Sequence, residues 1–188
     1  MRKSLLVIGA LIMGFGASAQ KWAVDKSHSN VGFTITHMMI SEVDGQFTDI
    51  DATITSSKDD LSDAVFEFTA QATSVDTRNE RRDNHLRSAD FFEVEKYPTV
   101  KFKSKKFTKI EGKKYTVVGD LTIKDVTKEI TMDVTVNGPI VHPRNQKKMV
   151  GIKAVGTIDR YDFHVGGESG ASTGREIEIH ANGEFIKE

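Results

Sequence analysis

The chain has 188 residues, with 26 lysines and arginines against 27 aspartates and glutamates, six histidines and no cysteine. A net charge of −1 provides no basic field for nucleic acid, and the lack of cysteine excludes disulfides, thiolate metal sites, cysteine nucleophiles and a lipid-anchored cysteine. Hydrophobic residues (38%) and charged residues (28%) are mixed along the chain, which is typical of one folded soluble domain rather than a disordered or membrane-spanning chain.

The first 19 residues have the three-part pattern of a secretory signal peptide. Arg2 and Lys3 precede the apolar run 5–15, and residues 17–19 are the small residues that signal peptidase accepts. The run is shorter than the roughly 20 residues that span a bilayer, so we expect cleavage before Gln20 rather than a retained anchor. We expect the mature chain, residues 20–188, to be exported without a membrane-integral segment, periplasmic in a host with an outer membrane and secreted otherwise.

Apolar residues recur at every second position through most of the mature chain, which is the period of half-buried β-strands. Short connections such as Lys124-Asp125 separate these runs and have the length of antiparallel hairpins. The three-residue step from Phe47 to Ile50 leaves the register of one run open. We predict about eight strands, with inward positions Val31, Phe33, Ile35 and His37; Phe47, Ile50, Ala52 and Ile54; Phe66, Phe68 and Ala70; Val100 and Phe102; Tyr115, Val117, Gly119, Leu121 and Ile123; Ile130, Met132, Val134 and Val136; Ile152, Ala154, Gly156 and Ile158; and Ile177, Ile179, Ala181, Gly183 and Phe185.

The alternation stops between Ser74 and Pro98. Thr77 followed by Glu80 has the spacing of a capping box, so we predict a short helix over residues 77–87 within an insertion around residues 77–92. The insertion concentrates arginines ahead of a phenylalanine pair, residues 91–92. Either the arginines bind an anionic or polar head group, or they pair with acidic neighbours while the phenylalanines fill the end of the fold.

Antiparallel strands with one apolar face must hide their edges, which in a chain of this length favours a closed barrel or a two-sheet sandwich. Gly119 and Gly156 share the inward face with larger residues, either to leave room inside a barrel or to mark bulges. We predict an all-β fold, an eight-stranded antiparallel barrel with one short helical insertion.

No motif indicates catalysis. None of the six histidines has the spacing of a zinc-binding pair, so we predict no metal site. His37 continues an inward strand face, where it needs a hydrogen-bond partner or a ligand group. Residues 167–171 lack the second glycine of a nucleophile elbow and favour a loop, and no phosphate-binding or dinucleotide-binding fingerprint occurs. We therefore expect no catalytic residues and no cofactor.

A series of motifs covers nearly the whole mature chain. It opens with Trp22-x-x-Asp25-x-x-His28-Ser29-x-Val31-x-Phe33, His37 and Val43-x-Gly45-x-Phe47. Its middle is Arg82-Asp83-x-His85-Leu86, Asp90-Phe91-Phe92 and Tyr97-Pro98-x-Val100-x-Phe102-x-Ser104. It ends with Gly119-Asp120-Leu121-Thr122-Ile123, Val126-Thr127-Lys128 and Arg160-x-Asp162-Phe163. In order and spacing these motifs resemble the YceI-like family of exported bacterial proteins, also called polyisoprenoid-binding or lipocalin-like proteins, with Asp125 and His164 where the family often has glycine.

The resemblance implies a lipocalin-like barrel whose apolar tunnel holds a long-chain isoprenoid or related amphiphile, polyprenyl or quinone-like, for transport or storage, and it implies no enzymatic reaction. An eight-stranded barrel has room for one ligand, and burial of a hydrocarbon chain needs no specific polar contact. From the strand pattern we predict the tunnel residues Phe33, Ile35, Phe66, Phe68, Phe102, Leu121 and Ile152.

For the ligand's head group we nominate His37, Arg81 and Asp162. Two alternatives remain open at this point: a filled barrel that acts as a structural or interaction module, and an enzyme acting on an isoprenoid head group with His37, His85 and Asp162 as acid–base residues. The sequence is also compatible with a homodimer.

Overall fold

The structure is a computed structural model that describes residues 19–58, 60–167 and 172–188. The predicted signal peptide (residues 1–18 of it) and most of the predicted loop 167–171 lie outside the described residues. Ten strands account for most of the described chain: β1 (Gln20–His37), β2 (Ser41–Phe47), β3 (Ile50–Ser56), β4 (Val65–Gln71), β5 (Val75–Asp76), β6 (Thr99–Glu111), β7 (Lys114–Ile123), β8 (Val126–Val141), β9 (Lys148–Asp159) and β10 (Thr173–Lys187). The helical segments are η1 (Ala72–Ser74), α1 (Glu80–Arg87) and η2 (Arg160–Phe163).

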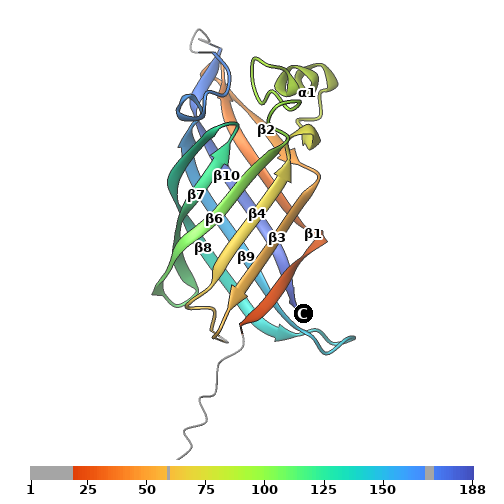
Figure 1. The fold of residues 1–188 in the computed structure, drawn as a ribbon, viewed down its shortest axis with the longest axis vertical. Helices are drawn as coiled ribbons and strands as arrows, with labels where there is room; N and C mark the ends of the chain where they lie inside the picture. Colours follow the sequence, from red (N-terminus) through yellow and green to blue (C-terminus); the bar gives the residue numbers. More distant parts are fainter. Residues whose placement is uncertain (1–18, 59, 168–171) are drawn as a thin grey trace, which may run out of the picture.

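The strands form one closed antiparallel barrel (Figure 1). Neighbours follow the order β10-β9-β8-β7-β6-β4-β3-β1, and β10 pairs with β1 to close it. The strands β2 and β3 act as a single wall strand, since β2 pairs with the second half of β1 and β3 with its first four residues. The wall therefore has eight strands, and the predicted all-β barrel with a short helical insertion is confirmed. The irregular step from Phe47 to Ile50 is the break between β2 and β3.

Alternation of side chains places the apolar residues inside. Along β7 every second residue from Tyr115 to Ile123 is buried, and the residues between them are partly exposed. Gly119 lies on this inward face opposite Ser104, where a side chain would collide with the ring of Phe102. The partner strand β6 also changes register next to Ser104. Both interpretations of this glycine therefore hold, because it makes room for a ring and sits opposite a bulge.

One end of the barrel is filled with side chains. We call it the packed end; it holds the first residues of β1 and the end of β10, and its interior is occupied by Trp22, Ile54, Leu61, Tyr115 and Val150, all buried. Trp22 is only 1% exposed and lies opposite Ile54 in the register of β1 and β3. The ring of Phe107 stacks on Tyr115 with centroids 4.6 Å apart. This end has the dense packing of an ordinary protein core.

The opposite end, the cap end, is covered by the insertion between β4 and β6, with α1 above the barrel (Figure 1). The predicted capping box is wrong in detail. Thr77 donates both its N–H and its hydroxyl to Asp83, 2.8 and 2.6 Å away, and so is not available as a helix cap. The helix instead begins at Glu80, and Asn79 caps it by accepting the N–H of Arg82 at 3.1 Å.

Among the described helices, none combines the length and the apolar character needed to cross a bilayer.

Candidate functional site

The inward side chains of the barrel enclose an apolar cavity of about 520 Å³. Its lining extends from Phe92 of the insertion at the cap end to Val24 and Phe185, which lie next to the packed end. All seven predicted tunnel residues line it, namely Phe33, Ile35, Phe66, Phe68, Phe102, Leu121 and Ile152. Their role in ligand binding stays a prediction.

The cavity exists because several of the inward residues are small. Ala52, Ala154 and Ala181 line it from three different strands, where larger side chains would meet across the barrel. Gly45 lies directly opposite Phe33, and a Cβ at this glycine would collide with the phenylalanine ring. Glycine therefore lets the ring lie close against the wall rather than across the interior. The space is a consequence of side-chain size at inward positions.

The insertion contributes an apolar lining to the cap end. Leu86, Phe91 and Phe92 all line the cavity, and the ring of Phe92 makes an edge contact with Phe47 at 5.7 Å. In one interpretation of the sequence, the two phenylalanines of this segment fill the end of the fold. The structure confirms this, because both rings pack against the core at the barrel's end. Gly166 permits this arrangement, because it has a φ of +73° and a Cβ there would lie 2.8 Å from the ring of Phe91.

Two arginines, Arg82 and Arg160, also line the cavity at its cap end. Arg160 is buried; its Nε donates to the carbonyl of Gly174 at 2.9 Å and one terminal nitrogen to the carbonyl of Val165 at 2.7 Å. Arg82 donates to the hydroxyl and the carbonyl of Thr77 at 2.7 and 2.8 Å. Within the described residues neither arginine has a carboxylate within 4.0 Å. The other terminal nitrogen of Arg160 donates to the Tyr161 hydroxyl at 3.1 Å. A guanidinium carries five N–H groups, so each arginine retains N–H groups beyond these bonds, which suits recognition of a polar or anionic group.

A comparison with protein-family models identifies the family to which the chain is related. The family model described as the YceI-like domain matches residues 22–185. The chain belongs to the YceI-like family. A UPF0312 protein of Staphylococcus aureus (strain N315) is 36% identical over 166 residues, which cover 86% of this chain and 94% of that protein.

Solved structures show the same fold. The YCEI protein of Campylobacter jejuni is 31% identical with a TM-score of 0.65, over 97% of this chain and 98% of that one. BcnA of Burkholderia cenocepacia is 23% identical with a TM-score of 0.77, over 86% and 98%. A polyisoprenoid binding domain from Saccharophagus degradans is 12% identical with a TM-score of 0.67, over 88% and 97%. The last two likenesses concern the fold alone.

Of the three residues nominated for the head group, only His37 lines the cavity of this YceI-like barrel. His37 lines the cavity at the end of β1, but it is exposed at the rim and not buried as its strand position predicted. Arg81 is exposed on α1 and does not line the cavity, since one residue along a helix turns the side chain by about 100°. Asp162 is exposed on η2 and pairs with Lys128 at 3.3 Å.

The arginines that do line the cavity are Arg82 and Arg160. Arg82 is one of the insertion arginines considered for a head group, but neither residue was among those nominated. Each opens a motif that was part of the family resemblance, and each lies one or two positions from a nominated residue. The signal available was their place in those motifs. Which side chain of a helix or of a 3₁₀ turn faces inward depends on how the turn is docked, and the strand pattern says nothing about that.

The departure from the family's glycine at position 164 keeps the local backbone. His164 ends η2 in the left-handed conformation, with φ +54° and ψ +36°, which glycine adopts most readily. At the β7–β8 hairpin the positive φ belongs to Lys124, and Asp125 is not among the positive-φ residues. Replacing glycine by aspartate there therefore needs no left-handed backbone at position 125.

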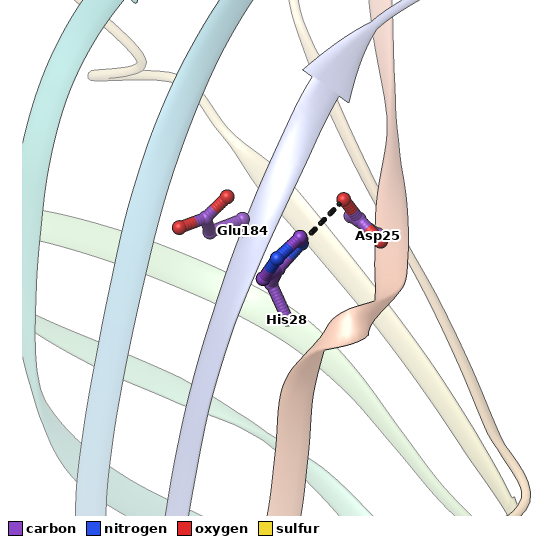
Figure 2. A group of neighbouring side chains, drawn as sticks. All are labelled: Asp25, His28 and Glu184. Carbon is purple, nitrogen blue, oxygen red and sulfur yellow. Dashed lines mark hydrogen bonds and ion pairs between the residues drawn. The ribbon is translucent and has the colours of Figure 1, made fainter.

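A second polar group lies where β1 bulges out of the wall. Asp25 pairs with Glu184 and Asn30 with Asn182, so four residues of β1 face a single residue of β10. Asp25, His28 and Glu184 have ligand-type atoms within 4.8 Å of one another, and the imidazole lies between the two carboxylates (Figure 2). The His28 Nδ1 lies 2.9 Å from an Asp25 carboxylate oxygen.

Hydrogen bonding governs the charge state of this group. The Ser27 hydroxyl donates to Asp25 at 2.6 Å, and this bond together with His28 lowers the pKa of Asp25 to about 2. The hydrogen bond to Asp25 in turn raises the pKa of His28 above its ordinary value. These contacts link Asp25, at the start of the bulge, to two residues inside it. The sequence did not predict this cluster, because only the bulge turns residues 25 and 28 to the same side.

Proposed function

We propose that this YceI-like protein binds a long-chain isoprenoid or related amphiphile, polyprenyl or quinone-like, for transport or storage. The observation that carries the proposal is the cavity of about 520 Å³, with an almost wholly apolar lining and two arginines at one end. Its volume lies within the range of small-molecule sites, and its lining offers a hydrocarbon chain little besides van der Waals contact.

The hydrophobic effect supplies enough free energy for such binding. Removing about 400 Å² of apolar ligand surface from water gains about 10 kcal/mol before the entropic cost of association is subtracted. An apolar wall discriminates poorly between chains, since one methylene changes the affinity by only about 1–3 kcal/mol. Selectivity must therefore come from the ligand's polar end.

The polar end of the ligand lies, in this proposal, at the cap end beside Arg82 and Arg160. Their free N–H groups favour a phosphate, a carboxylate or a quinone-type oxygen over a second hydrocarbon tail. His37 stands at the same rim, where it can hydrogen-bond to a head group. The chain then extends past Phe68 and Leu121 toward the packed end.

Family membership supports binding rather than catalysis, and the related fold from Saccharophagus degradans is described as a polyisoprenoid binding domain. The empty volume disfavours the alternative of a filled structural module, whose inward side chains would meet. The export part of the proposal rests on the N-terminal signal-peptide pattern, and we infer that the ligand is held outside the cytoplasm without a further cofactor.

The test is to purify the protein from its native host, extract it with organic solvent and identify the bound molecules by mass spectrometry. We expect one long-chain amphiphile near one molecule per barrel. A protein that is empty, and that also fails to take up added isoprenoid alcohols or phosphates, would overturn the proposal and return the filled module to first place. Turnover of an added isoprenoid would instead favour the enzyme.

A further inference from the structure

The tip of the β1–β2 hairpin exposes three consecutive large apolar side chains. Met38, Met39 and Ile40 are 54%, 81% and 87% exposed. The other exposed large apolar residues of the described chain are Val65, Ile110, Ile140 and Val141, and all four lie toward the packed end. The hairpin tip is thus the single apolar projection that the described residues form at the cap end.

The backbone of this tip makes the choice of residue unusual. Met38 and Met39 have φ values of +52° and +59°, a left-handed conformation in which hairpins ordinarily use asparagine or glycine. Asparagine and glycine would relieve the backbone and remove exposed apolar surface. The chain instead carries two long, flexible thioether side chains, which adapt to an irregular apolar environment.

The tip stands directly on the rim of the cavity. His37, immediately before it, lines the cavity, as do Thr173, the first residue of the neighbouring strand β10, and Ser172 just before that strand. The Met38 N–H donates to the Ser172 carbonyl at 2.7 Å, which fixes the hairpin beside that part of the rim. A surface that receives the tip is therefore brought against the cap end of the cavity.

We propose that this hairpin tip inserts into the interfacial layer of a lipid bilayer and holds the cap end against it for exchange of the ligand. The inference rests on the proposed lipid-binding function. A ligand with a long apolar chain resides in a membrane and scarcely in water, so a carrier gains from docking its open rim there. Arg81, exposed on α1 at the same end and without an ion pair among the described residues, is suited to contact lipid phosphates.

The shape of the tip favours a bilayer over a protein partner. Three side chains on a convex turn bury much less than the roughly 800 Å² per partner of a stable protein interface. A bilayer surrounds such a tip on every side and needs no complementary groove. Docking of this kind is reversible, as exchange of a ligand requires.

The experiment uses flotation with vesicles of phosphatidylcholine and phosphatidylglycerol, and transfer of dansyl-labelled farnesol from those vesicles. The test variant is Met38→Asn/Met39→Gly/Ile40→Ser, whose first two residues suit the left-handed backbone and so protect folding. The control is Ile140→Ser/Val141→Ser, which removes two other exposed apolar side chains (61% and 54% exposed) from the packed end.

We expect the tip variant to bind vesicles at least tenfold more weakly and to acquire the farnesol probe from them correspondingly more slowly. Its affinity for the probe delivered from ethanol should stay within twofold of the wild type, as should every property of the control. The docking proposal would be overturned if the wild-type protein did not bind vesicles, or if the tip variant and the control lost vesicle binding equally. Failure of the wild type to bind the probe from ethanol would instead count against the proposed function, and vesicle binding would still be measured separately.

Discussion

The packed end and the cap end of the barrel use the same alternating strands and differ in what stands on the inward face. At the packed end, aromatic rings such as Trp22 and Tyr115 are buried in one core cluster with Leu61 from the β3–β4 loop. Toward the cap end the inward positions include Ala52, Ala154 and Ala181, and a cavity remains. The period of the pattern decides which face is inside, and side-chain volume decides whether the inside is core or binding site.

Truncation of one aromatic ring at each end tests most directly whether the two ends differ in packing. Trp22→Ala should destabilise the protein by about 3–5 kcal/mol in urea unfolding, because it leaves a void in a filled core. Phe33→Ala should lose less than half as much, since this half-buried ring already borders empty space. Equal losses would mean that the two ends are equally well packed and that the cavity is not a structural feature in solution.

Substitution of Arg160 tests whether its hydrogen bonds to backbone carbonyls stabilise the cap end of the barrel. Arg160→Met should destabilise the protein by about 3 kcal/mol, because the carbonyls of Gly174 and Val165 lose donors at a buried site. Arg81→Met, at an exposed position on α1, is the control and should change stability by less than about 0.5 kcal/mol. Similar stabilities of the two variants in urea unfolding would show that the buried guanidinium is not a structural tie.

How far the sequence could predict these features follows from the two ends. The two-residue period of the strands correctly placed all seven predicted tunnel residues on the cavity wall. Successive side chains of a strand point to opposite faces, so the face of a residue depends only on whether its position along the strand is odd or even. Parity fails wherever the ladder is interrupted: at the break between β2 and β3, and at the four-residue bulge after Asp25. It also says nothing of α1 and η2, where Arg82 and Arg160 face the cavity while Arg81 and Asp162 do not.

Filling the cavity should make the cap end resemble the packed end. Leu121→Trp adds volume at the cavity wall and should weaken binding of dansyl-labelled farnesol by about tenfold or more, which corresponds to about 1.4 kcal/mol. Val118→Trp, on the outward face of the same strand, should leave the affinity unchanged. Fluorescence titration of both variants, after thermal unfolding shows them folded, measures the difference. Unchanged affinity in Leu121→Trp would remove this residue from the predicted site.

A smaller effect is expected at the edge of the cap end, where His164 occupies a left-handed position. His164→Gly should raise the free energy of unfolding by about 1 kcal/mol. Glycine removes the steric cost of a Cβ at a φ of +54°, and this gain is larger than the loss from the greater entropy of the unfolded chain. His164→Ala removes the same imidazole but keeps the Cβ, so it should not stabilise. If both variants gained stability in urea, the imidazole and not the backbone would be responsible.

The smallest expected effect concerns the bulge in β1, which lies between Trp22 of the packed end and Phe33 at the cavity. The pKa of Asp25 is lowered to about 2, so its contribution is complete above pH 4 and is lost as the pH falls toward 2. The pKa of His28 is raised, so its contribution is complete below its unfolded value near 6.5 and is lost as the pH rises through its folded value. The pair therefore stabilises the bulge most between about pH 4 and 6.5.

Because His28 is exposed, the change in stability is small, and it is best measured as a difference. The Tm of the wild type should fall relative to that of His28→Gln as the pH is raised from 5 to 9. Glu184→Gln should keep most of this dependence, since Glu184 acts on the pKa of His28 through charge alone and less than the bond to Asp25 does. A wild-type Tm that moves in parallel with His28→Gln would show that the bulge is held by its backbone and by Ser27, whose hydroxyl donates to Asp25 irrespective of the imidazole's charge.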